Sequence, residues 1–80
     1  MGCFIGQIEL FPYDFAPMYW LRCNGTLISI RQYPELYTLL GTRYGGDGVD
    51  TFGLPNLQGT EPIPWTNYCI CVQEGDYPQP

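Results

Sequence analysis

The sequence predicts a small, single α+β domain over residues 1–80, mostly β, in which short strands form a sheet and one short helix packs on it. Apolar and polar residues alternate along several short segments, as expected of strands. Ten glycines and eight prolines among 80 residues are about twice the usual share, so turns are frequent and strands are short. Residues 31–40 alone have the apolar spacing of an α-helix.

The first and last strands are predicted at the two ends of the chain. Residues 3–11 alternate in polarity and end at Pro12, which has no amide hydrogen for a strand ladder. Residues 67–73 alternate in the same way and place Cys69 and Cys71 on one face.

A β-hairpin is predicted between residues 19–23 and 26–28. The two segments flank Asn24-Gly25, the strongest two-residue signal for a hairpin turn. Asn24 is also followed by Gly25-Thr26, which completes an acceptor sequence for N-glycosylation. The sequence leaves open whether Asn24 carries a glycan.

The helix is predicted over residues 31–40. Leu36, Leu39 and Leu40 follow the i, i+3, i+4 spacing and form an apolar stripe. Pro34 suits the first turn, where its missing amide costs nothing, and Gly41 suits a left-handed cap. Ten residues are too few for a stable isolated helix, so the stripe is expected to dock on the sheet.

A glycine-rich loop is predicted over residues 44–50, followed by an extended segment over residues 51–57. Asp47 and Asp50 in this region would supply oxygen ligands to a calcium ion, but the spacing lacks the further acids of an EF-hand. Turn chemistry explains these residues better.

The charge balance excludes several classes of function. The chain has eight acidic residues, three basic residues and no histidine, for a net charge of −5. It therefore lacks the cations that nucleic acids or anionic membranes require. It has no apolar run long enough to span a membrane and no visible signal peptide. Nucleophilic sites that need histidine are excluded, and neither enzyme activity nor a cofactor is expected.

The four cysteines leave two interpretations open. If the first and last strands pair antiparallel, Cys3 would lie opposite Cys69 or Cys71, at a distance that allows a disulfide. Such a bond would lie within one chain or join two chains. The alternative is buried free thiols, and Cys23 is expected in the core. The spacing is not that of a zinc site, so no metal is expected.

The surface composition predicts self-association. Charged residues make up 14% and aromatic residues 16% of the chain. Few charges and many tyrosines are typical of assembly interfaces, so a homo-oligomer or polymer is expected. The interface candidates are Tyr13, Trp65 and Tyr77. Alternatively, Trp and Tyr faces would stack on a cell-surface glycan.

In their order along the chain, these segments resemble the phage tail collar domain family of short tail fibre proteins and proteins similar to microcystin-dependent protein. The likeness spans about residues 4–73. It rests on Ile5-Gly6-Gln7-Ile8, Phe15-Ala16-Pro17, Trp20-Leu21-Arg22-Cys23-Asn24-Gly25, Leu36-Tyr37-Thr38-Leu39-Leu40-Gly41-Thr42, Tyr44-Gly45-Gly46-Asp47-Gly48, Thr51-Phe52-Gly53-Leu54-Pro55-Asn56-Leu57 and Asn67-Tyr68-Cys69-Ile70-Cys71-Val72-Gln73.

The chain also departs from the family pattern. Residues 58–61 stand where the family usually has Arg-Gly-Arg, and residues 62–66 replace a long variable segment. The resemblance implies a structural subunit, commonly trimeric in fibres, that self-assembles into a fibre, collar or extracellular filament. It implies a location in the virion or at the cell exterior, and it supplies no catalytic residues. The alternative is a host- or glycan-binding tip module.

Overall fold

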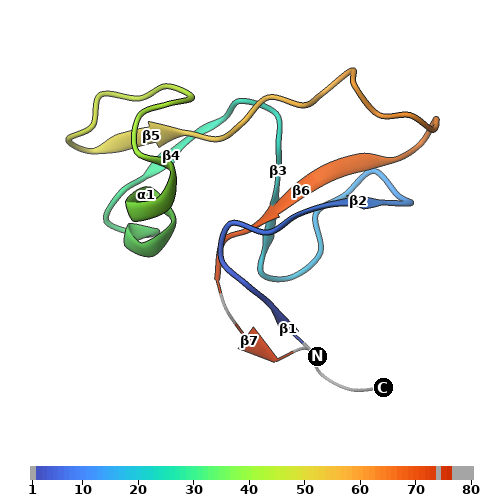
Figure 1. Ribbon diagram of the computed structural model, residues 1–80, viewed down its shortest axis with the longest axis horizontal. Helices are drawn as coiled ribbons and strands as arrows, with labels where there is room; N and C mark the ends of the chain where they lie inside the picture. Colours follow the sequence, from blue (N-terminus) through green and yellow to red (C-terminus); the bar gives the residue numbers. More distant parts are fainter. Residues whose placement is uncertain (1, 74, 77–80) are drawn as a thin grey trace.

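The computed structural model describes residues 2–73, 75 and 76 (Figure 1). Over these residues it confirms the predicted α+β class, mostly β. In chain order the elements are β1 (Gly2–Cys3), β2 (Ile8–Phe11), β3 (Trp20–Arg22), β4 (Leu27–Ser29), α1 (Pro34–Leu40), β5 (Thr51–Gly53), β6 (Asn67–Cys71) and β7 (Gly75–Asp76). The described helix, α1, is far shorter than a membrane span requires.

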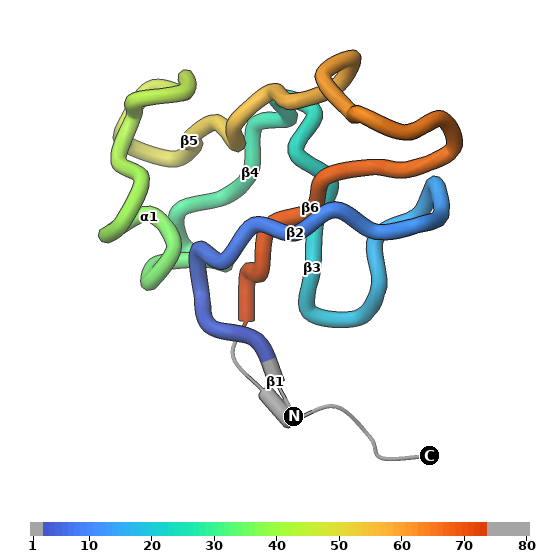
Figure 2. The backbone as a smooth tube through the Cα atoms, turned by 45° about the vertical axis from the view of Figure 1, so that its right-hand side comes forward, coloured from blue at the N-terminus to red at the C-terminus, as the bar shows by residue number. Residues whose placement is uncertain are grey.

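The central sheet has the strand order β2-β6-β3, with β6 pairing antiparallel to both neighbours. The first and last predicted strands therefore pair antiparallel, which is the condition on which the disulfide interpretation depended. Two smaller ladders join β4 to β5 and β1 to β7. In Figures 1 and 2, α1 and the β4–β5 ladder form one half of the molecule, and the central sheet forms the other.

The two faces of β6 carry different cores. Ile70 faces the larger core, which also contains the buried side chains Leu36, Phe52 and Leu54. Cys69 and Cys71 face a smaller core, which also contains Cys3 and Trp20. This division follows from the alternation of side chains along a strand.

The predicted hairpin between residues 19–23 and 26–28 is wrong. The strand β3 pairs with β6, whereas β4 pairs with β5. Residues 54–57 take the backbone bonds that a hairpin would use, because the Leu54 N–H donates to the Thr26 carbonyl at 3.0 Å and the Leu57 N–H to the Cys23 carbonyl at 2.8 Å. The Asn24 side chain accepts the Thr26 N–H at 3.1 Å, so the chain turns a corner there.

The predicted first strand, residues 3–11, is interrupted between Cys3 and Ile8. Gly6 has φ +91°, a left-handed conformation that favours glycine, and the Gln7 N–H donates to the Phe4 carbonyl at 2.9 Å. This turn separates the short β1 from β2.

The helix begins at Pro34 rather than at residue 31, because residues 29–33 form a separate turn closed by the Tyr33 N–H on the Ser29 carbonyl at 3.1 Å. Gly41 ends the helix with φ +58°, and its N–H donates to the Tyr37 carbonyl. The apolar stripe docks only in part, since Leu36 is fully buried whereas Leu39 is 59% exposed.

The loop over residues 44–50 is closed by Asp47. One carboxylate oxygen of Asp47 accepts the N–H groups of Val49, Asp50 and Thr51 at 2.8, 2.9 and 3.0 Å. These bonds to the charged form lower the pKa of Asp47 to about 2. The prediction that Asp47 has a turn-forming role is confirmed, because its carboxylate accepts three backbone N–H groups of the loop.

Candidate functional site

A row of aromatic rings leads from the smaller core to the surface. Trp20 is buried and lies edge to face with Phe11 at a ring-centroid distance of 4.9 Å. Phe11 stacks on Tyr13 at 5.5 Å, and Tyr13 stacks on Phe15 at 4.2 Å. Phe15, at the outer end of the row, is 57% exposed. The row therefore connects the packed sheet to an exposed apolar surface.

Asn67 fixes the loop that carries these rings. Its side chain is buried, and its amide donates to the carbonyls of Tyr13 and Phe15, the latter at 3.4 Å. Its oxygen accepts the thiol of Cys69 at 2.9 Å. Sequence reasoning did not single out Asn67, although a polar residue that begins an otherwise apolar strand is a usable signal for a buried hydrogen-bonding role.

Trp65 lies in the turn just before β6. Its side chain is 86% exposed, and its backbone has φ +66°. A residue other than glycine in this left-handed region costs about 1 kcal/mol or more. Ile63 in the same turn is also exposed, and the Thr66 hydroxyl donates to the Ile63 carbonyl at 2.6 Å. The turn holds two apolar side chains out in solvent.

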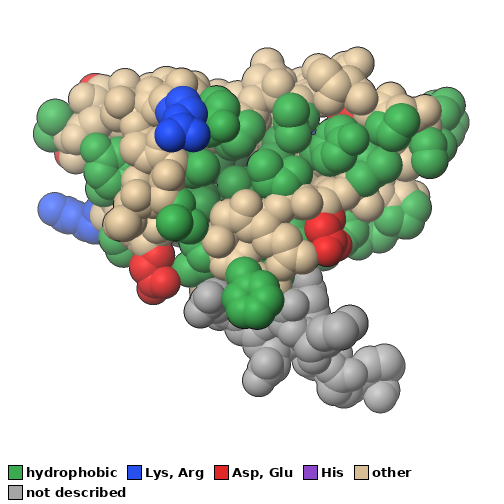
Figure 3. Space-filling model, in the orientation of Figure 1, with side chains coloured by type: hydrophobic (Ala, Val, Ile, Leu, Met, Phe, Trp, Pro, Cys, Tyr) green, Lys and Arg blue, Asp and Glu red, His purple; other side chains and the backbone are tan. Residues whose placement is uncertain are grey.

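The loop over residues 12–16 and the turn over residues 62–66 lie at the same end of the molecule (Figures 1 and 2). Hydrophobic side chains gather toward this end in the space-filling view (Figure 3). We call the surface formed by Tyr13, Phe15, Ile63 and Trp65 the aromatic end.

A disulfide joins Cys3 to Cys71 within one chain. Cys69 is two residues away from Cys71 on the same face of β6, and it is a buried free thiol. Of the two partners considered for Cys3, the bond is to Cys71. Cys71 ends β6, and Cys3 lies in β1, which pairs with β7 just after β6 in the chain.

Cys23 is the other free thiol, and it is buried as expected. Burial and the nearby Cys69 thiol raise the pKa of Cys23 to about 11, and burial also raises the pKa of Cys69. Both thiols are therefore neutral at pH 7. A bond from either one to another chain would require the sheet to open.

The comparisons with known proteins decide the family. The Phage Tail Collar Domain family model matches residues 6–62. The chain belongs to the phage tail collar domain family. No curated protein shows a significant match to it.

The matched range runs from the turn at Gly6 through β5 to the start of the turn that carries Trp65. It confirms the family predicted from the sequence motifs. The resemblance predicted from the sequence also included residues 67–73, which contain β6 and lie beyond the matched range. The family is one of structural proteins of phage tails.

Of the three predicted interface residues, this collar domain brings two to the same end. Tyr13 is half-buried between two rings, and Trp65 projects into solvent. Tyr77 lies outside the described residues. Among the described side chains, no three His, Cys, Asp or Glu residues gather as a metal site would require.

Proposed function

We propose that this collar domain is a structural subunit of a phage tail fibre or related filament that assembles with copies of itself through the aromatic end. The observation that carries the proposal is Trp65, which is 86% exposed on a left-handed backbone. Covering a tryptophan of this exposure contributes on the order of 4 kcal/mol. That gain exceeds the cost of the left-handed backbone at Trp65. Burial of the tryptophan in an assembly would therefore offset the strain of the turn.

The charges around the aromatic end support the same proposal. Residues 11–20 and 62–67 include one charged side chain, Asp14. The centres of protein interfaces are depleted of charge and enriched in aromatic residues. A surface of this composition is unfavourable in water. In a homo-oligomer, the same surface of a second copy of the chain would cover it. A location in the virion is part of this proposal.

The ring row gives the aromatic end the rigidity that a contact surface needs. Phe15 and Tyr13 stack in series on Phe11, and Asn67 holds the backbone of both outer residues. Little side-chain freedom remains to be lost on association, and this lowers the cost of binding.

Sedimentation velocity over a concentration series tests the proposal. We expect the wild-type protein to associate and Trp65→Ala to weaken the association constant at least tenfold. Val49→Ala is the matched control, because Val49 is 76% exposed but lies in the loop over residues 44–50, and we expect it to leave association unchanged. A wild-type protein that stays monomeric, or equal effects of the two variants, would contradict the proposal. Negative-stain microscopy of the wild type then distinguishes closed rings from filaments.

A further inference from the structure

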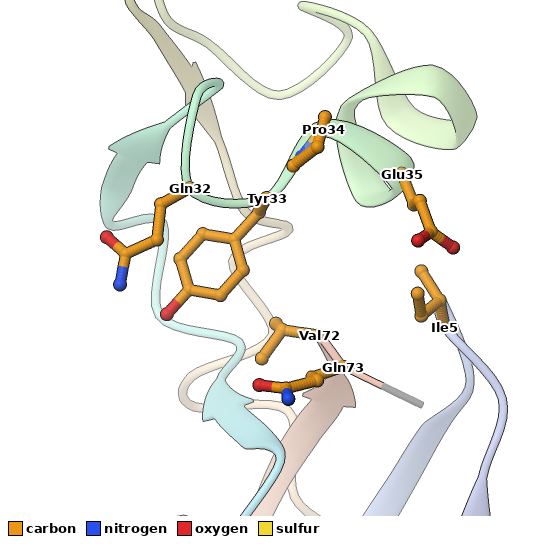
Figure 4. Close-up of a pocket in the computed structure, with 7 residues that line it drawn as sticks. All are labelled: Ile5, Gln32, Tyr33, Pro34, Glu35, Val72 and Gln73. Carbon is orange, nitrogen blue, oxygen red and sulfur yellow. The ribbon is translucent and has the colours of Figure 1, made fainter. Parts of the chain in front are cut away.

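A hollow of about 340 Å³ lies beside the start of α1 (Figure 4). Its volume falls within the range of small-molecule sites. Three separate segments line it: the turn before β2, the start of α1 with the residues before it, and the two residues directly after β6. The lining residues are Ile5, Gln32, Tyr33, Pro34, Glu35, Val72 and Gln73.

The apolar part of the hollow consists of one ring and two aliphatic side chains. Val72 is buried and Ile5 is half-buried. In Figure 4, Val72 lies next to the Tyr33 ring, and Ile5 lies on the opposite side of the view. The backbone of Tyr33 is fixed at both its groups. Its N–H donates to the Ser29 carbonyl at 3.1 Å, and its carbonyl accepts the Tyr37 N–H at 3.1 Å. The backbone that carries the ring is therefore fixed by the turn and by the first turn of the helix.

Polar groups surround this apolar part. Gln32, Glu35 and Gln73 are exposed. In Figure 4, Gln32 and Gln73 lie near the Tyr33 ring, and Glu35 lies farther away beside Ile5. Their side chains, like the Tyr33 hydroxyl, form no hydrogen bond with another described residue. Two amides, a phenol and a carboxylate together offer several donors and acceptors to a ligand. No basic side chain lines the hollow.

We propose that this hollow, the Tyr33 pocket, binds one neutral pyranose unit of a glycan. A pyranose has an apolar face of C–H groups, which stacks on an aromatic ring, and a rim of hydroxyl groups that both donate and accept hydrogen bonds. The Tyr33 pocket presents the matching ring and the matching polar groups. Glu35 and the net charge of −5 disfavour an anionic sugar.

This inference is independent of the self-assembly proposal. The Tyr33 pocket uses none of the four residues of the aromatic end. It assigns the glycan-binding alternative, which the aromatic content suggested, to one pocket with Tyr33 as the stacking ring.

Methyl-resolved NMR titration tests the inference with defined probes. These are methyl α-D-glucopyranoside, methyl α-D-galactopyranoside and N-acetyl-D-glucosamine, with N-acetylneuraminic acid as the anionic comparator. We expect at least one neutral sugar to shift the methyl signals of Ile5 and Val72 saturably, with a dissociation constant on the order of 1 mM, as befits one small ligand. We expect the anionic sugar to leave these signals unchanged.

Three variants assign the binding to the pocket. Tyr33→Ala is expected to weaken binding at least tenfold. Gln73→Ala, which removes an exposed side chain that makes no bond within the described fold, is expected to weaken it several-fold even if Tyr33→Ala fails to fold. Tyr44→Ala is the matched control, and Trp65→Ala separates the two proposals; both are expected to retain sugar binding. No shift with any neutral sugar, or binding that survives both pocket variants, would overturn the inference.

Discussion

The two faces of β6 hold the domain together by different means. On one face, Ile70 packs with Phe52 and Leu36 in a core built from aliphatic and aromatic side chains. On the other face, Cys71 is bonded to Cys3 and its neighbour Cys69 is hydrogen-bonded to Asn67. The first core consists of packed apolar side chains, whereas the second adds a covalent bond and a buried polar contact to the packing of Trp20.

The difference shows how a chain of 80 residues manages with a small core. Domains of this size bury a low fraction of their surface and often need an additional staple. Here the staple lies on the face of β6 that has the fewer apolar residues. The stability of the domain should therefore depend on redox conditions as well as on the packing of the larger core.

The largest expected effect is on the apolar face. Phe52 is fully buried and lies edge to face with Tyr37 at 5.3 Å. Phe52→Ala should lower the free energy of unfolding by about 4–5 kcal/mol, because it removes buried ring surface and leaves a cavity. Urea denaturation measures this loss. Phe4→Ala, at an exposed ring, is the control, with an expected change of about 0.5 kcal/mol or less.

The disulfide face should show the next largest effect. The bond spans a sequence separation of 68 residues, and opening a loop of that length removes about 4 kcal/mol of stability. Dithiothreitol should lower the free energy of unfolding of the wild type by this amount, which urea denaturation measures. Cys3→Ser should be destabilised already and should not respond to the reductant. Equal midpoints for oxidised and reduced wild type would remove the distinction between the two faces.

Asn67 should give a smaller effect on the same face. Asn67→Ala removes the amide that bonds to Tyr13 and Phe15, and it should cost about 2 kcal/mol because buried backbone carbonyls lose their donors. Hydrogen exchange should rise in the loop over residues 12–16 while the amides of β5 stay protected. Gln58→Ala, at an exposed side chain, should change neither quantity. Uniform loss of protection would show that the two cores are not separable.

The smallest expected effect concerns Asp47, which lies outside both cores. Its pKa falls from 3.8 to about 2 on folding, so its contribution to stability is complete above about pH 4 and is lost as the pH falls toward 2. Asp47→Asn should remove this part of the acid dependence, whereas Asp50→Asn should retain it. Unfolding midpoints measured between pH 2 and pH 5 give the comparison. Identical acid profiles for the wild type and Asp47→Asn would contradict this assignment.

Local sequence patterns predicted those strands and helix ends that depend on neighbouring residues in the chain. Alternation of polarity predicted β6 and β2. Gly41 marked the end of the helix, whereas the predicted start at residue 31 lies three residues before the observed one. The hairpin at Asn24-Gly25 was wrong because strand pairing is decided by distant segments. Residues 54–57 compete for the same backbone groups, and no local signal reports such competition.

The candidate sites show the same limit. The parity of strand faces reduced the possible disulfide partners of Cys3 to two, but only the path of β1 selects Cys71. The Tyr33 pocket gathers residues from near positions 5, 33 and 72, so no contiguous motif marks it. Trp65 is exposed on a left-handed backbone, a conformation that sequence rarely predicts for a bulky residue.

The bond between Cys3 and Cys71 also determines how the domain would carry mechanical load. It encloses the segment from residue 3 to residue 71 in a covalent ring. A pulling force applied on both sides of that ring passes through the sulfur–sulfur link and leaves both cores unloaded. The oxidised domain should therefore keep its length at forces that unfold the reduced chain. Reduction of this one bond would allow residues 3–71 to unfold and extend under the same force.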